Sequence, residues 1–314
     1  MPILAAPPGA GPGAGFPKIG FAVATWRAPD GTTWPLTDWP RGWFTESEGV
    51  SGLDAAPIEL ATDDRTRGGA GVRHIQPQPR SIVWPLHVYG DDHSEFLGRW
   101  RALMAAFTQT TRLGPGTLEI ARPDGTARRI DAYYQGGFEG QGKQGTGITS
   151  DNAVITLFCE DPYWRDTVAQ PVHREFATGE DYLQPYPSIS SGQVLGATTI
   201  LVRGEVDAWP DWVITGPASL ITATHEDTGE AFALDPDAPD IGHGNLLAGE
   251  QVTISTDPPR VRYQDGSNWT AALNWPGAVL WPLRPGPNSV TFQLDGAAAG
   301  SAVDLSFFPR YESA

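Results

Sequence analysis

The stretch SEFLGRWRALMAAF, residues 94–107, decides the fold of the first half of the chain. Its large apolar side chains recur every three or four residues, which is the spacing of one face of an α-helix. They are Phe96, Leu97, Trp100, Leu103, Met104 and Phe107. Ser94 is a suitable N-cap, and acidic residues precede it near the positive end of the helix. The sequence therefore predicts one helix with a single buried face, ended by the glycines around Pro115.

Short β-strands are predicted on both sides of this helix, because apolar and β-branched runs alternate there with Gly, Pro and Asp turns. Before the helix they are expected at 20–27, 33–36, 56–61 and 80–89; after it they are expected at 117–121, 127–134 and 153–159. The charged, glycine-containing stretch from Thr62 to Gly71 separates two of these strands, and we expect it to be the long loop of an extended hairpin.

The remainder of the chain lacks helical periodicity. Residues 188–314 consist of strand-like runs about 8–12 residues apart, a pattern typical of an antiparallel β-sandwich. We therefore predict a mainly β protein in four parts. These are a flexible arm (1–19), a domain of β-sheet and one helix (20–168), a linker rich in charge and proline (169–187) and a β-sandwich domain (188–314).

The charge of the chain argues against nucleic-acid binding. The formal net charge is −16, and residues 170–314 hold 18 acidic and 6 basic side chains, so that 18 − 6 leaves −12 in this half. Contact with phosphates needs basic side chains. No run approaches the roughly 18 apolar residues that a membrane helix needs, so no membrane insertion is predicted.

The sequence contains no recognisable pattern for catalysis, a cofactor or a metal. The six histidines are not spaced as zinc ligands, and the single cysteine, Cys159, is expected to be a small strand residue. The glycine-rich run 136–142 lacks the strand, helix and lysine of a phosphate loop. Three aspartates in one loop, Asp235, Asp237 and Asp240, could bind calcium, although a solvated acidic turn is the preferred interpretation. We predict a protein that is not an enzyme and has no cofactor.

The order of several short motifs resembles the distal tail proteins of long-tailed bacteriophages. The run begins at residues 49–57 (GVSGLDAAP) and continues through 84–90 (WPLHVYG) and the helix. It then passes 116–120 (GTLEI), 123–125 (PDG) and 133–137 (YYQGG) to 161–164 (DPYW). In the second half, 209–210 (WP), 214–217 (ITGP), 247–250 (LAGE), 252–256 (VTIST) and 283–290 (LRPGPNSV) also fit.

The resemblance implies a specific architecture and role. The first half would be a tail-tube-like domain that forms a ring, expected to be hexameric, and the second half would be a galectin-like sandwich. The ring would join the tail tube protein to the tail-tip hub, and the sandwich would offer a platform for fibre or receptor-binding proteins. The protein would be a structural component of the virion at the tail tip or baseplate, assembled in the cytoplasm of the host bacterium.

Two groups of residues are candidates for binding. A hairpin loop that extends from Thr62 to Gln76 would carry Arg65, Arg67 and Arg73, which could pair with carboxylates of the next subunit; the alternative is a mobile exposed loop. Trp269 and Trp275 could form a platform for a partner or a glycan, and we expect Trp269 to be exposed because its neighbours are polar, whereas Trp281 should be buried. Two other functions remain open: a carbohydrate-binding module for adsorption to the host, and, less favoured, a glycan-degrading enzyme.

Overall fold

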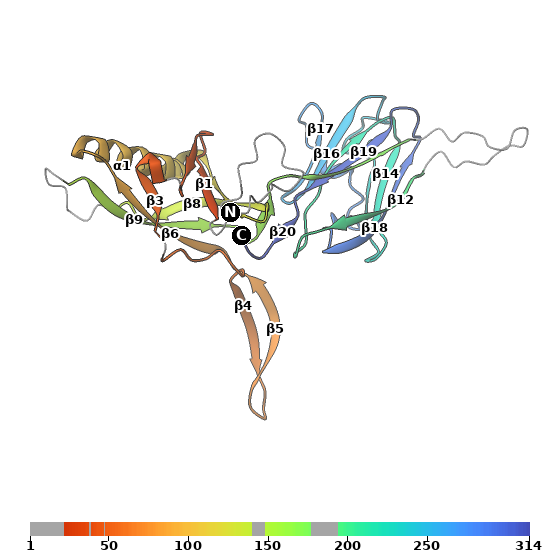
Figure 1. Cartoon of the computed structure of the whole chain (residues 1–314). Coiled ribbons are helices and arrows are strands. Elements are labelled where there is room, and N and C mark those ends of the chain that lie inside the picture. The colour runs from red at the N-terminus through yellow and green to blue at the C-terminus, as the bar shows by residue number, and fades with distance from the viewer. Residues whose placement is uncertain (1–21, 38, 47, 140–147, 177–193) are drawn as a thin grey trace, which may run out of the picture. The chain divides into compact units, whose positions relative to one another are not determined.

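The computed structural model describes residues 22–37, 39–46, 48–139, 148–176 and 194–314. The predicted arm at 1–19 and most of the predicted linker lie outside these ranges. The chain forms two compact units, one of residues 1–167 with 312–314 and one of residues 168–311. Both units are mainly β, with antiparallel sheets (Figure 1), as the sequence predicts.

The first unit is a curved antiparallel sheet covered by a helix. In chain order its elements are β1 (Val23–Arg27), β2 (Thr33–Pro35), η1 (Trp39–Arg41), β3 (Trp43–Thr45), β4 (Ile58–Asp64), β5 (Ala70–Pro77), β6 (Arg80–Tyr89), α1 (His93–Thr108), α2 (Thr110–Leu113), β7 (Gly116–Ala121), β8 (Ala127–Gly136), β9 (Ser150–Cys159) and β10 (Trp164–Asp166). The main sheet has the strand order β2-β1-β7-β8-β9-β6-β3, with β10 beside β8. The indole nitrogen of Trp43 donates to the carbonyl of Pro35 at 2.7 Å and thereby links the two edge strands.

Helix α1 lies against one face of this sheet (Figure 1). Of the predicted apolar face, Phe96, Leu103 and Phe107 are buried, and the other three residues are half-buried. Leu103 and Phe107 are fully buried, and Phe107 stacks on Trp26 of β1 with 4.7 Å between ring centroids. The helix begins at His93, two residues earlier than an N-cap at Ser94 would allow. Asp92 is the N-cap, and its carboxylate accepts a 2.8 Å hydrogen bond from the backbone N–H of Glu95, so the expectation for Ser94 was wrong.

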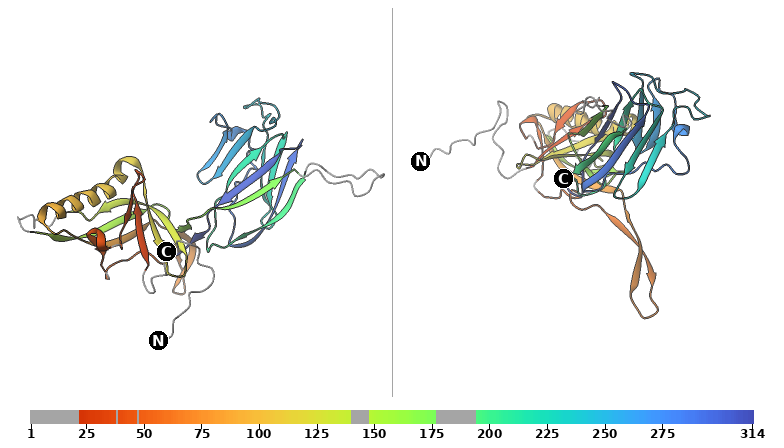
Figure 2. Two further views of the ribbon diagram at one scale, coloured as in Figure 1. Left: turned by 45° about the horizontal axis from the view of Figure 1, so that its top comes forward. Right: turned by 90° about the vertical axis from the view of Figure 1, so that its right-hand side faces the viewer.

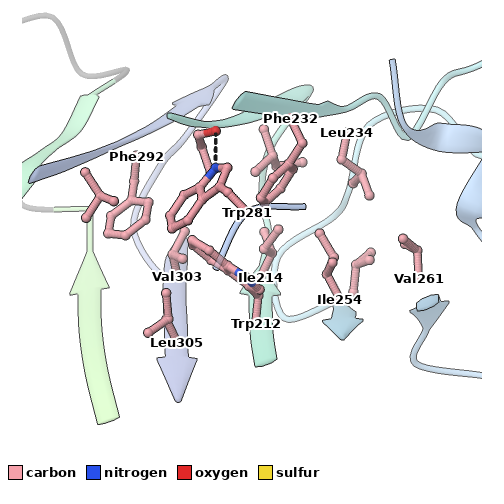
Figure 3. Close-up of a cluster of buried hydrophobic side chains, with 14 of the residues drawn as sticks. Trp212, Ile214, Phe232, Leu234, Ile254, Val261, Trp281, Phe292, Val303 and Leu305 are labelled. Atoms are coloured by element: carbon pink, nitrogen blue, oxygen red, sulfur yellow. Dashed lines mark hydrogen bonds between the residues drawn. The ribbon is translucent and has the colours of Figure 1, made fainter. Parts of the chain in front are cut away.

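The second unit is a two-layer antiparallel sandwich. Its elements are β11 (Gln170–Glu175), β12 (Val194–Val202), β13 (Asp211–Thr215), β14 (Leu220–His225), β15 (Glu230–Leu234), β16 (Gln251–Thr256), β17 (Pro259–Tyr263), η2 (Thr270–Ala272), β18 (Gly286–Asp295), β19 (Ala302–Phe307) and β20 (Arg310–Tyr311). One sheet has the order β11-β19-β13-β16-β17 and the other β12-β18-β14-β15. Inward-facing side chains from both sheets form the core around Trp212 and Trp281, whose rings meet edge to face at 5.0 Å (Figure 3).

The start of the predicted linker is part of this sandwich. β11 pairs along its whole length with β19, from Gln170 opposite Phe307 to Glu175 opposite Ala302. Residues 170–175 are therefore an edge strand rather than linker, because alternate side chains such as Val172 pack against the core while His173 faces solvent. The linker residues 177–187 lie outside the described part of the chain.

A buried arginine joins distant segments of the first unit. Arg80, at the start of β6, is only 1% exposed, and its guanidinium donates to four backbone carbonyls. These are the carbonyls of Gly52 (2.8 Å), Asp54, Pro162 (2.7 Å) and Glu312 (2.7 Å). Buried carbonyls cannot find water, so these bonds fix the chain before β4 and the last residues of the chain onto one point of the sheet.

We expect Arg80→Met to lower the free energy of unfolding of the first unit by about 3 kcal/mol, because methionine fills the space but leaves the buried carbonyls without donors. Urea unfolding followed by circular dichroism measures this change. Arg112→Met, at an exposed site on α2, is the control and should change stability by less than about 0.5 kcal/mol. Equal effects of the two substitutions would contradict the role assigned to Arg80.

Candidate functional site

The most unusual surface of the protein is the two-stranded ribbon β4–β5. Figure 1 and the right view of Figure 2 show it extending away from the main sheet of its unit. The two strands pair only with each other, from Ile58 opposite Pro77 to Asp64 opposite Ala70. An isolated two-stranded hairpin is marginally stable in water, so a ribbon of this length needs further contacts.

The ribbon differs from the predicted hairpin. We expected strand 56–61 to pair with strand 80–89 across a long loop, whereas residues 58–64 pair with 70–77 within that stretch. Only residues 65–69 form the turn, in which Gly68 and Gly69 have positive φ angles of 88° and 80°. The loop prediction failed because the polar side chains of this segment gave no sign of a buried strand, and none of its residues enters a core.

One face of the ribbon is apolar. Directly opposed residues share a face, as do alternate residues along one strand. The pair of Leu60 and Ile75 thus shares a face with the pair of Ile58 and Pro77. The pairing register shifts between Ala61 and Thr62, so that Thr62 lies opposite Val72. This shift places Val72 on the same face as Leu60 and Ile75. We call Ile58, Leu60, Val72, Ile75 and Pro77 the apolar ribbon face.

The apolar ribbon face is open to solvent in the isolated chain. The side chains of Ile58, Leu60, Val72 and Ile75 are 49–59% exposed. Exposed apolar residues that lie together on one face indicate a surface that another molecule covers. The sequence analysis did not identify these four residues as a binding surface, although the alternation of Ile58 with Leu60 in the predicted strand could have indicated an apolar face.

The opposite face and the tip of the ribbon carry its charges. Arg73, at the register shift, forms a 3.5 Å ion pair with Asp63, and both side chains are mostly exposed. Arg65 and Arg67 lie in the turn, and the backbone N–H of Arg65 donates to Gly69 at 2.9 Å. The structure therefore separates the three predicted arginines: two lie at the tip, and the third lies on a strand next to a carboxylate of its own chain.

The root of the ribbon is held firmly. The backbone N–H of Gln78 donates to Pro57 at 2.8 Å and closes the base of the hairpin. Just before it, the backbone N–H of Ala56 donates to the carboxylate of Glu312 at 3.0 Å, while Arg80 holds Gly52 and Asp54. These bonds attach the ribbon to the core of its unit at one end only.

The predicted tryptophan platform requires a correction. Trp269 is only 4% exposed, because its ring stacks on Tyr263 at 4.6 Å and lies 5.1 Å from the ring of His243. It is a core residue, and the expectation that it is exposed was wrong. Trp275 is 55% exposed and donates from its indole nitrogen to the carbonyl of Thr270 at 2.9 Å. Trp281 is fully buried, as predicted.

The remaining candidates have structural explanations. Cys159 is buried, and burial raises the pKa of its thiol to about 12, so the reactive thiolate is scarce at neutral pH. Asp235 accepts from the backbone N–H of Asp237 at 2.9 Å within its turn. Among the described residues, no three His, Cys, Asp or Glu side chains are grouped to bind a metal. The described helices include none that is long and apolar enough to span a membrane.

No family model matches the sequence, and no curated protein is significantly similar to it. The fold, however, is similar to solved structures of phage proteins. One is the Dit protein of phage SPP1, described as a paradigm of the hub adsorption apparatus in phages that infect Gram-positive bacteria. The TM-score is 0.64 at 12% identity, over 92% of this chain and 99% of that protein.

A second similar structure is a chain of the phage P2 baseplate in its activated conformation with calcium. It has a TM-score of 0.55 at 12% identity and covers 94% of this chain and 100% of that one. The same baseplate with strontium gives a TM-score of 0.53. This chain therefore has the fold of these tail and baseplate proteins over almost its whole length, as the resemblance of the motifs predicted.

The two tryptophans of the predicted platform should differ in their effect on stability. We expect Trp269→Ala to lower the free energy of unfolding by about 3 kcal/mol, because it leaves a cavity beside Tyr263. Trp275→Ala should cost less than about 1 kcal/mol, because that ring is largely in solvent. Urea unfolding of both variants checks this, and a tolerated Trp269→Ala would show that Trp269 is not a core residue.

Proposed function

We propose that this chain is a structural subunit of a phage tail tip or baseplate, of the distal tail type, and that copies of it form a closed ring. The observation that carries the proposal is the apolar ribbon face, which no described residue of the chain's own first unit covers. Similarity of fold to phage hub and baseplate proteins, extending over nearly the full length of both chains, supports it.

A ribbon of this kind favours a head-to-tail contact. It is a projecting element of the first unit that pairs with no other strand, and we infer that a neighbour receives it on an unlike surface. Contacts between unlike surfaces generate a ring when the rotation between copies closes. Each half-exposed apolar side chain that becomes buried contributes roughly 1 kcal/mol, and four of them act together in every contact.

The charges at the tip would make the contact specific. Arg65 and Arg67 have no ion pair to a described residue, whereas Arg73 already has Asp63. Arginine forms paired hydrogen bonds with carboxylates, and such bonds strengthen when the contact excludes water. We infer that Arg65 and Arg67 pair with acidic side chains of the adjacent subunit, and that Arg73 stabilises the ribbon itself.

The similarity of fold supports the finer parts of the proposal. The ring would be hexameric and would connect the tail tube protein to the tail-tip hub. The sandwich would be an outer platform for fibre or receptor-binding proteins. The protein would be assembled in the host cytoplasm and reside in the virion, and its function would need neither catalysis nor a cofactor.

Three substitutions on the apolar ribbon face test the proposal. We expect the triple variant Ile58→Ser, Leu60→Ser, Ile75→Ser to sediment as a monomer in analytical ultracentrifugation under conditions in which the unaltered protein forms a closed oligomer. The change should not unfold the chain, because these side chains lie outside any core. At a concentration at which the unaltered protein is also monomeric, circular dichroism should accordingly give the same thermal transition for both proteins.

A matched variant on the opposite ribbon face is the control. Ala61→Ser, His74→Ser and Gln76→Ser alter residues that face away from Leu60 and Ile75, and this variant should keep the oligomer. The proposal fails if the unaltered protein remains monomeric at its highest soluble concentration. It also fails if the apolar-face variant assembles as well as the control.

A further inference from the structure

The five-stranded sheet of the sandwich carries two adjacent arginines on its outer face. Arg260 and Arg262 lie on the edge strand β17 and are exposed, while Val261 between them is buried in the core. Side chains alternate along a strand, so both arginines face away from the core on the same side. Within the described residues, neither guanidinium has an acidic partner within 4 Å, in contrast to Arg99, which binds Glu95 at 2.6 Å.

Polar side chains surround the two arginines in a shallow hollow of about 520 Å³. The neighbouring strand β16 places Ser255 directly opposite Arg260 and Thr253 directly opposite Arg262. Gln251 and Gln264 also line the hollow. The hollow thus presents hydroxyl and amide groups, which both donate and accept hydrogen bonds, beside two guanidinium groups that are permanently charged.

One of the arginines is held in place by the turn that follows it. A guanidinium nitrogen of Arg262 donates to the carbonyl of Gly266 at 2.8 Å. An arginine has five N–H donors, so this bond orients the group and leaves donors for a ligand. The two arginines are two residues apart on one strand, about 7 Å between Cα atoms, so their long side chains can converge on one anion.

Acidic residues on the same sheet face limit what can bind. Asp211 of β13 lies opposite Ser255, and Asp304 of β19 lies opposite Val213 of β13, so both face the same side as the arginines. They lie at least two strands from β17, which is roughly 10 Å. Asp304 is also bound to the ring of His173 at 2.6 Å. A ligand with many negative charges would be repelled there, whereas one with a single anionic group at the edge would not.

We propose that this hollow binds an acidic saccharide. A carboxylate or phosphate group of the sugar pairs with Arg260 and Arg262, and neighbouring sugar hydroxyls bond to Thr253, Ser255 and Gln251. The site lies entirely within the sandwich and does not require a ring, so it stands independently of the function proposed above. It would give the protein a direct contact with a polysaccharide that carries isolated carboxylate or phosphate groups.

Isothermal titration of the full chain with three trisaccharide probes tests the site: one that contains a single glucuronate residue, maltotriose that carries a single phosphate group, and neutral maltotriose. We expect at least one anionic probe to bind and maltotriose not to bind. Binding of the glucuronate probe alone would identify a carboxylated sugar as the ligand, and binding of the phosphorylated maltotriose alone would identify a phosphorylated sugar.

The two arginines are then substituted, and a control variant loses the same number of positive charges elsewhere on the sandwich. Arg260→Gln with Arg262→Gln should weaken binding of the anionic probe roughly tenfold or more. Arg203→Gln with Arg284→Gln makes the same change in charge at exposed sites outside the hollow and should leave binding unchanged. The proposal is overturned if neither anionic probe binds the unaltered protein, if maltotriose binds equally well, or if both double variants lose binding to the same extent.

Discussion

The guanidinium of Arg80 is the point on which the first unit depends. It is buried, and its four hydrogen bonds join segments that are far apart in the sequence: the approach to the ribbon, the turn after β9 and the last residues of the chain. A positive charge is costly to bury, and here backbone carbonyls compensate it. The ribbon, whose surface cannot stabilise itself, therefore starts from a fixed root.

A fixed root matters because an exposed apolar surface is useful only when it is presented in a defined direction. Association costs less conformational entropy when the contacting element is already positioned. The ribbon meets this requirement, since its base is closed by the bond from Gln78 to Pro57 while its apolar face stays open. The sandwich is different in kind: its core around Trp212 is formed within the unit, and the arginines that we propose to bind a ligand lie on an outer sheet face.

Much of the fold could be predicted because its periodic signals are strong. The repeat from Phe96 to Phe107 located the helix, and alternating residues located the sandwich strands. Residues 56–61 were predicted as a strand, but the rest of the ribbon was predicted as a loop, because periodicity identifies strands that enter a core and residues 62–77 do not enter one. Trp269 was expected in solvent because its polar sequence neighbours do not reveal the stacking on Tyr263, which comes from the neighbouring strand β17.

Hydrogen–deuterium exchange of the ribbon amides tests the central claim most directly. The claim is that residues 58–77 are incomplete in the single chain and become covered by a second copy. Exchange is measured over a dilution series that spans assembly, with the sandwich strand β14 as internal reference. The account predicts that protection of residues 58–77 rises in step with the fraction of assembled protein while β14 stays constant. Ribbon amides that exchange equally fast in assembled and dissociated protein would contradict it.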